Sequence, residues 1–340
     1  MVNTFDPSQY VRTLYEATVP PMPELEAEKI ELWQQGLRQT IVGLLGGFPQ
    51  AAGDLLVRED EPEERGWYRS QKVVFRSRPG MDVPGYFLTP SSGKPSGATI
   101  ICIHGHGPGV TSLIGLEPDG RPRKQFTGLH KDYALMSVKH GHNALAIEQA
   151  CFGTRRDELA KSAGPEESCC QPIAGAALLL GQTVLGWRVY DVIRALDYLC
   201  GRPDVSPSRI GCMGLSAGGT TTLFAAALDV RVKAAVVSGY FNTFLDSIMA
   251  VPHCICNYVP GMLSHAEMYH LAGLVAPRAL FIESATRDLI YPAEGTKRAY
   301  AQAKRIFDAL GAGHQIALEV FDGDHEFSGR SCFEFLADKL

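Results

Sequence analysis

Hydrophobic positions recur at spacings of three and four near the N-terminus, and farther along they gather into short continuous runs. The first pattern consists of Ile30, Trp33, Leu37, Ile41 and Leu44. It predicts an amphipathic helix over 23–45, which the following Gly-Gly-Phe-Pro sequence ends. The charged segment 58–65 beyond it is predicted to be a linker.

The rest of the chain alternates between apolar runs and helical stripes. The runs occupy 72–76, 83–88, 98–103, 144–147, 209–213, 232–237, 279–282 and 316–321. The first two flank a Ser-Arg-Pro-Gly turn and predict an antiparallel pair, whereas later runs alternate with helical stripes over 185–199 and 300–310. This order predicts an α/β fold with a mostly parallel central sheet and helices on both faces. We expect an N-terminal helical extension and linker over 1–70 and a main α/β domain over 71–340, with a small cap-like insertion near 240–275.

The composition is that of an ordinary globular protein. Of the 340 residues, 45% are hydrophobic and 20% charged, which excludes disordered and collagen-like classes. Apolar runs stay well below the roughly 18 residues of a membrane span, and the first residues do not predict a signal peptide. Nine irregularly spaced cysteines, some within apolar runs (Cys102, Cys212), indicate a reducing, cytoplasmic location. A mild net charge of −5 and a basic stretch at 121–124 without aromatic neighbours argue against nucleic-acid and membrane partners, while a homo-oligomer stays open.

A candidate nucleophile lies at the junction of a predicted strand and a predicted helix. After the run at 209–213 comes Gly214-Leu-Ser216-Ala-Gly218, and a good helix follows. A G-x-S-x-G pattern in this setting is typical of a serine nucleophile on a tight turn, where small residues allow close backbone approach. The alternative is a glycine-rich turn with a capping serine. The strand before the motif and the helix after it favour Ser216 as the nucleophile.

A serine that attacks a carbonyl needs donors for the oxyanion that forms. The amide of Ala217, directly after the nucleophile, is one candidate. The loop after 98–103 runs His104-Gly-His106-Gly107-Pro-Gly, and its glycines let backbone amides point into a site. We expect the second donor to be the amide of His106 or of Gly107.

The base and the acid are expected after the last strands of the sheet. His325 follows the run at 316–321 within a polar Asp-Gly-Asp-His-Glu loop, and a surface histidine is the alternative interpretation. Beyond the run at 279–282 stand two carboxylates, Glu283 and Asp288. Asp288 is preferred because it lies a short loop past the strand, where it could orient His325. The order Ser, Asp, His along the chain is the order of the G-x-S-x-G hydrolases.

Histidine and cysteine pairs raise a competing metal hypothesis. His104 with His106, and His140 with His142, are pairs two residues apart, but no carboxylate or cysteine stands at a ligand spacing beside them. Cys254-x-Cys256 lacks a second ligand pair. We therefore expect neither a metal nor a cofactor.

The substrate pocket is expected under the long aromatic connection at 240–275. Tyr240, Phe241 and Tyr258 from this segment are candidate substrate-binding residues, together with His104 and Phe152. Ordinary packing against the sheet is the alternative.

From about residue 71 to its end the chain resembles the α/β-hydrolase superfamily, and within it the dienelactone hydrolase and acetyl xylan esterase-like branch. The resemblance lies in 79–90, His104-Gly-His-Gly107, 202–219, 276–280 and Asp324-His325. It implies ester hydrolysis through an acyl-serine without a cofactor. Dienelactone hydrolases carry cysteine where this chain has Ser216, so lactone specificity is not implied. The segment 148–155 takes the place where relatives often have an Asp-x-Arg-Gly-x-Gly turn; the aspartate of that turn is absent here, and Glu148 receives no role.

The sequence thus predicts a serine esterase for small to medium carboxylic esters, with carbohydrate acetyl esters among the candidates. Cleavage of an amide, a peptide or a carbon–carbon bond by the same three residues is the alternative enzyme. A non-catalytic binding protein on a hydrolase scaffold is the alternative from another class.

Overall fold

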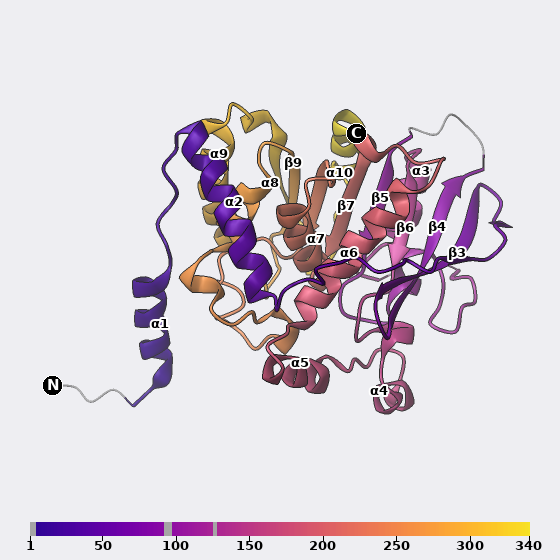
Figure 1. The fold of residues 1–340 in the computed structure, drawn as a ribbon, viewed down its shortest axis with the longest axis horizontal. Coiled ribbons are helices and arrows are strands. Elements are labelled where there is room, and N and C mark those ends of the chain that lie inside the picture. The colour runs from indigo at the N-terminus through magenta and orange to yellow at the C-terminus, as the bar shows by residue number, and fades with distance from the viewer. Residues whose placement is uncertain (1–4, 92–96, 125–127) are drawn as a thin grey trace.

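A ten-stranded sheet runs through the protein, in the order β1-β3-β4-β6-β5-β7-β8-β9-β10, with β2 paired to β3 (Figure 1). The computed structural model describes residues 5–91, 97–124 and 128–340. The strands are β1 (Arg58–Glu59), β2 (Glu63–Glu64), β3 (Tyr68–Arg78), β4 (Met81–Pro90), β5 (Thr99–Ile103), β6 (Asn143–Ile147), β7 (Ile210–Leu215), β8 (Ala234–Ser238), β9 (Ala279–Ala285) and β10 (Ile316–Phe321).

Strand direction follows the sequence pattern. β3 and β4 form an antiparallel hairpin, and β4 pairs antiparallel with β6. The strands from β6 through β5, β7, β8 and β9 to β10 are all parallel. Every residue of β5 to β9 is buried, as expected for strands covered on both faces. The predicted mostly parallel sheet is confirmed, and the predicted linker differs in carrying β1 and β2, which extend the sheet along β3.

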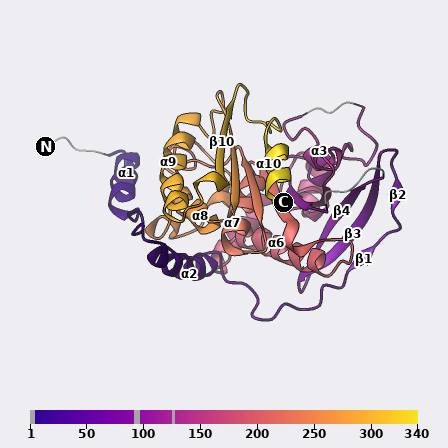
Figure 2. The same ribbon diagram turned by 90° about the horizontal axis from the view of Figure 1, so that it is seen from above.

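Helices cover both faces of the sheet, as predicted (Figure 2). One face packs under α6 (Val184–Cys200), α7 (Ala217–Leu228), α8 (Met268–Val275) and α9 (Ala293–Ala309). The other face packs under α3 (Tyr133–Lys139) and α10 (Cys332–Lys339). Alternate residues of one strand reach opposite layers: Ile101 joins the first core and Cys102 the second. The short helices α4 (Glu158–Ala163) and α5 (Cys170–Leu179) lie in the connection between β6 and α6.

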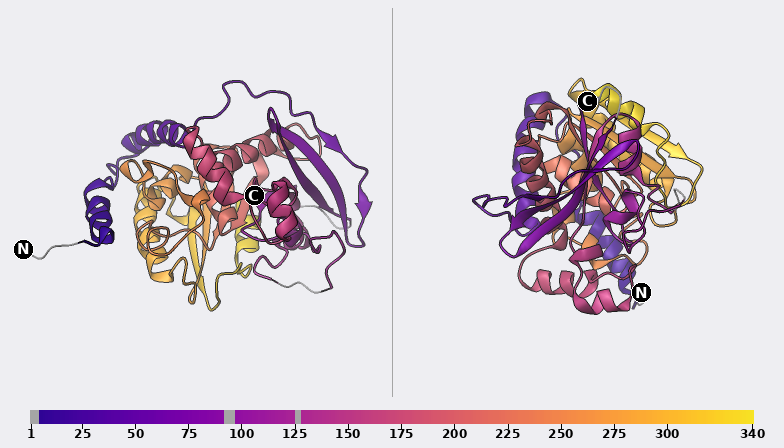
Figure 3. Two further views of the ribbon diagram at one scale, coloured as in Figure 1. Left: turned by 90° about the horizontal axis from the view of Figure 1, so that it is seen from below. Right: turned by 90° about the vertical axis from the view of Figure 1, so that its right-hand side faces the viewer.

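Two N-terminal helices attach to this body in different ways (Figure 3). α2 (Ala27–Leu44), the helix predicted over 23–45, buries Ile30 and Ile41 in the first core. Its Gln34 amide donates to the carbonyl oxygens of Gly273 and Ala276, at 2.7 and 2.8 Å. α1 (Pro7–Thr18) has no buried side chain. α2 is therefore built into the core, and α1 lies at the periphery.

The predicted insertion near 240–275 is folded around two short 3₁₀ turns, Ile255–Asn257 and Met262–Ser264, followed by α8. Among the described residues, no helix is long and apolar enough to cross a membrane.

Candidate active site

Ser216 occupies a strained turn between β7 and α7. Its backbone has φ 57° and ψ −120°. This positive-φ conformation costs a non-glycine residue about 1–3 kcal/mol. The two motif glycines explain how the turn fits. A Cβ on Gly218 would come within 1.8 Å of the Ile103 carbonyl oxygen, and one on Gly214 within 2.3 Å of Gly218. The two glycines of the G-x-S-x-G motif are therefore required by close backbone packing around the turn. This turn places Ser216 at the carboxyl edge of the sheet.

His325 and Asp288 come together from the loops after β10 and β9. The Nδ1 of His325 lies 2.7 Å from Oδ2 of Asp288. The other carboxylate oxygen of Asp288 accepts hydrogen bonds from the amides of Ile290 and Tyr291, at 2.8 and 3.0 Å. The Tyr291 ring stacks on the imidazole with 5.8 Å between centroids. Asp288 is thus a buried, fully bonded carboxylate that holds the imidazole in one orientation.

Glu283, the other candidate acid, has different partners. It is buried at the end of β9, and its two oxygens accept from the amides of Ser328 and Gly329, each at 3.1 Å. Burial raises the pKa of this carboxyl group. Glu283 therefore fixes the loop that leads to α10, and Asp288 is the carboxylate that contacts His325.

A cleft of about 250 Å³ contains Ser216 and His325 together. The residues that line it are His106, Leu129, Ser216, Pro252, His253, Cys254, Asn257, Ile290, Tyr291 and His325. The His325 side chain keeps 21% of its surface exposed, so it can reach a bound molecule. Among the hydrogen bonds of the described residues, none joins Ser216 to His325, and such bonds commonly tighten only when substrate binds.

Two of the residues proposed to supply oxyanion donors, Ala217 and His106, lie close to the nucleophile. Ala217 is the first residue of α7, where a backbone amide has no partner inside the helix. In the loop after β5, the amide of Gly105 is already taken, because it donates to Nε2 of His130 at 2.7 Å. Burial holds the pKa of His130 well below its usual range, so its ring is neutral and can accept this bond. His106 is the next residue of the loop, and its side chain lines the cleft.

Two adjacent residues at the end of β6 support this loop. The buried Glu148 accepts from the amides of Val110 and Thr154, at 2.8 and 3.3 Å, and so joins the loops after β5 and β6. The amide of Gln149 donates to Nε2 of His104 at 3.0 Å. Sequence reasoning gave neither residue a role. The signal available was the place of Glu148 directly after a buried strand.

The five predicted substrate-binding residues lie outside the lining of the cleft. His104, Phe152, Tyr240 and Phe241 are buried, and the last two belong to the core under the sheet. Tyr258 is 42% exposed and borders a separate apolar hollow with Met249. The predicted connection does reach the cleft, but through Pro252, His253, Cys254 and Asn257. Small and polar residues of an irregular loop carry no periodic signal, so the sequence pointed to its aromatic residues instead.

Neither histidine pair weighed as a metal site gathers with further ligands among the described residues, whereas another set of potential ligands does. The His140 ring stacks on Phe333, and the buried His104 is held by Gln149. Among the described residues, one group of potential ligands gathers closely, and it comprises His106, Cys170, Cys254 and Cys256. These four could hold a metal ion beside the cleft.

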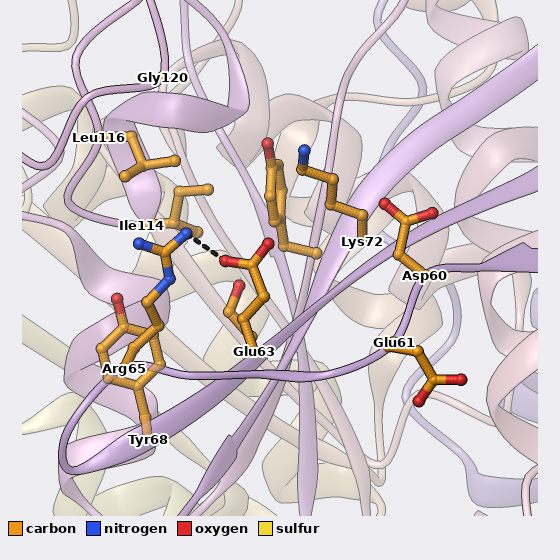
Figure 4. Close-up of a pocket in the computed structure, with 11 residues that line it drawn as sticks. Asp60, Glu61, Glu63, Arg65, Tyr68, Lys72, Ile114, Leu116 and Gly120 are labelled. Carbon is orange, nitrogen blue, oxygen red and sulfur yellow. Dashed lines mark hydrogen bonds and ion pairs between the residues drawn. The ribbon is translucent and has the colours of Figure 1, made fainter.

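A second hollow, of about 100 Å³, lies at the antiparallel edge of the sheet (Figure 4). Charged residues of β2 and its neighbours line it, and Arg65 is ion-paired to Glu63 within it. Neither Ser216 nor His325 is part of its lining.

Comparison with known proteins identifies a family and a relative of this chain. A model of the abhydrolase family matches residues 10–301. The Bacillus subtilis (strain 168) protein named "Putative hydrolase YtaP" is 28% identical over 282 residues, which cover 81% of this chain and 88% of that protein.

Solved structures share the fold. A protein of Bacteroides fragilis NCTC 9343 titled "putative acetyl xylan esterase" superposes with a TM-score of 0.78 at 18% identity, over 98% of this chain and 90% of the other. The glucuronoyl esterase from Solibacter usitatus gives a TM-score of 0.67 at 15% identity, over 95% and 99%. The α/β-hydrolase fold that the sequence predicted is confirmed, and the family match over most of the length shows that the chain belongs to the abhydrolase family.

Proposed function

We propose that this protein is a serine hydrolase that cleaves carboxylic esters through an acyl-serine intermediate. One observation carries the proposal. The imidazole of His325, bonded to the buried Asp288 at 2.7 Å, shares a cleft with a serine on a strained strand-to-helix turn. This set of side chains suits the activation of a hydroxyl for attack on a carbonyl.

In the proposed reaction, Oγ of Ser216 attacks the ester carbonyl while Nε2 of His325 accepts the hydroxyl proton. Asp288 accepts a hydrogen bond from Nδ1 and stabilises the imidazolium. The amides of Ala217 and of His106 or Gly107 bind the oxyanion. The imidazolium gives its proton to the leaving alcohol. Water then attacks the acyl-serine with His325 as base, which releases the acid and restores the serine.

The cleft favours compact substrates. Its volume of about 250 Å³ and its apolar lining by Leu129, Pro252 and Ile290 suit a short acyl group. The likeness in fold to acetyl xylan and glucuronoyl esterases makes carbohydrate esters the first natural class to test. The chain's nine cysteines are all free, which supports a reducing, cytoplasmic location as part of the proposal.

The test compares esters that differ in acyl length and alcohol. We expect hydrolysis of p-nitrophenyl acetate and butyrate to exceed that of the octanoate, and a fluorophosphonate probe to label Ser216, as read by peptide mass spectrometry. Acetylated xylo-oligosaccharides and glucuronate methyl esters then define the alcohol side. Amide and β-diketone substrates test the alternative reactions of the same residues. Failure of the probe to label any serine, with no ester cleaved, would reject the proposal.

A further inference from the structure

A group of potential metal ligands lies at the wall of the cleft, and two of its four members line the cleft. It consists of His106 from the loop after β5, Cys170 at the start of α5, and Cys254 and Cys256 from the connection between β8 and α8. We call these four residues the cysteine–histidine cluster. One ligand atom from each lies within 4.8 Å of all the others. The sulfur atoms of Cys254 and Cys256 are 3.2 Å apart, and Cys256 Sγ is 3.9 Å from Nε2 of His106.

We propose that the cysteine–histidine cluster is a structural zinc site that ties residues 104–109 to the opposite wall of the cleft. These residues, which follow β5 and carry the candidate oxyanion donors, are called the oxyanion loop below. Three thiolates and one imidazole are a common structural ligand set for Zn²⁺. With bonds of about 2.3 Å to sulfur and about 2.0 Å to nitrogen, a tetrahedral site holds its ligand atoms roughly 3.5–3.8 Å apart. The observed separations bracket this range, so small side-chain rotations bring all four atoms into coordination. Thiolate ligands disfavour Mg²⁺ and Ca²⁺.

The charge around the cluster fits a bound zinc ion. Three thiolates, a neutral imidazole and Zn²⁺ leave one net negative charge. Arg188 on α6 is buried beside them, and its guanidinium donates to Cys170 Sγ at 3.1 Å and to the Ala150 carbonyl oxygen at 2.9 Å. Its one positive charge balances the site. On binding, the three thiols release their protons to solvent, and no redox step is required.

Neighbouring groups hold the ligands in place. The Phe152 ring contacts the His106 imidazole edge to face, with centroids 5.0 Å apart and planes at 85°. The Asn257 side chain donates to the Cys254 carbonyl oxygen at 3.3 Å, and Thr220 on α7 bonds to Asn257 in turn at 3.3 Å. Such outer contacts orient first ligands in metal sites and raise their affinity. The buried Phe152, predicted to bind substrate, thus lies against the cluster.

The site would act on catalysis through His106. Its side chain is a ligand of the cluster, while its backbone amide is a candidate oxyanion donor. Zinc would therefore fix the position of that amide and of the segment carrying His253, which lines the cleft. This positioning role rests on the proposed function, whereas zinc binding itself does not. All four positions are filled by protein atoms, so the metal has no open site for substrate.

The first test measures metal in the intact protein. The chain is expressed in zinc-supplemented medium, purified without chelators and analysed by inductively coupled plasma mass spectrometry. We expect about one zinc ion per chain. Replacement by Co²⁺ should give visible bands of a tetrahedral site and near-ultraviolet thiolate charge-transfer bands. Less than about 0.1 zinc per chain, both as purified and after zinc is added to the reduced protein, would overturn the proposal. A disulfide between Cys254 and Cys256 in the intact mass would also overturn it.

Variants then locate the site and separate it from hydrolysis. Cys170→Ser and Cys256→Ser should each lose zinc, whereas Cys200→Ser, at the end of α6 outside the cluster, should retain it. In the two zinc-depleted proteins we expect kcat on p-nitrophenyl acetate to fall about tenfold with KM little changed, because a displaced amide weakens transition-state binding. Full zinc retention by both variants would contradict the assignment. Zinc binding by a protein that cleaves no ester would reject the proposed function and leave the zinc site standing.

Discussion

Asp288 and His325 each follow one strand of the parallel sheet, and a single 2.7 Å contact joins them. The cysteine–histidine cluster on the same cleft is assembled from three separate segments, none of them in a strand. The first group is positioned by strand order, because parallel strands deliver their following loops to one edge. The second depends on how irregular connections pack. Topology therefore fixes the proposed proton path, and loop packing fixes what surrounds the bound substrate.

The largest expected effect comes from removing Ser216, the nucleophile that Asp288 and His325 are proposed to activate. Ser216→Ala should lower kcat on a short ester by roughly 10³-fold or more, because no other hydroxyl occupies the turn. Unfolding in urea should be little changed. Ser162→Ala, on the exposed side of α4, is the matched control and should keep the full rate. Retained activity in Ser216→Ala would remove the basis of the proposed mechanism.

The next effect separates the two buried carboxylates. Asp288→Asn should lower kcat by about 10²–10⁴-fold. The Asn oxygen would keep the bonds from the Ile290 and Tyr291 amides, so its NH₂ would face Nδ1 of His325, favour the unproductive tautomer and fail to stabilise the imidazolium. Glu283→Gln, whose partners are the Ser328 and Gly329 amides, should mainly reduce stability. The measurement is kcat beside the urea midpoint for both variants. A larger loss of kcat in Glu283→Gln would reverse the assignment.

A smaller effect tests the support of the oxyanion loop. Glu148→Gln keeps one acceptor oxygen where two amides now donate, so one of them loses its partner. We expect a destabilisation of about 1–3 kcal/mol and a fall in kcat near tenfold. Glu117→Gln serves as control, because Glu117 is partly exposed and lies beyond the 3₁₀ turn Val110–Leu113 that follows the oxyanion loop. If Glu148→Gln changes stability but leaves kcat intact, the loop does not depend on this carboxylate for its catalytic position.

The smallest effect is a pH dependence of stability. The pKa of the buried His130 is well below its usual range, so the unfolded chain binds a proton near pH 6.5 that the folded protein excludes. The stability contribution is present above pH 6.5 and is lost as pH falls, with a slope of up to about 1.4 kcal/mol per pH unit. The free energy of unfolding in urea is measured for the protein and for His130→Gln at several pH values between 5 and 7.5. The difference between the two pH slopes gives the contribution of His130. Identical slopes would contradict it.

The succession of strands along the chain and the triad candidates could be predicted from the sequence, because both depend on local patterns. Apolar runs marked β5 to β10, and glycine spacing marked Ser216 through close backbone contacts that only small residues permit. The preference for Asp288 over Glu283 rested on loop length, and the contact with His325 agrees with that preference. β1 and β2 could not be predicted, because two-residue strands of charged residues have no hydrophobic period.

Contacts between irregular segments could not be predicted from the sequence, because they depend on tertiary packing. The Cys254-x-Cys256 motif is visible in the sequence, but its partners in the cluster are His106, from the loop after β5, and Cys170, at the start of α5. Only the packing of these three segments brings the four residues together. Tyr240 was expected at the pocket, but aromatic residues after a buried strand gain more from the core than from a wet cleft. The hydrophobicity of a residue indicates that it is buried, but it does not indicate which segment the residue packs against.

The attachment of α2 has a practical consequence for anyone who shortens this protein. Gln34 and Arg38 together satisfy four main-chain oxygens, those of Gly273, Ala276, Ala227 and Leu274. A chain trimmed to start at residue 71 would expose these acceptors and the hydrophobic surface of the first core that α2 covers. We therefore expect it to aggregate on expression. Trimming after α1 should be harmless by comparison. Trypsin acting on the folded protein should accordingly nick α1 at Arg12 early and spare α2 until the whole body opens.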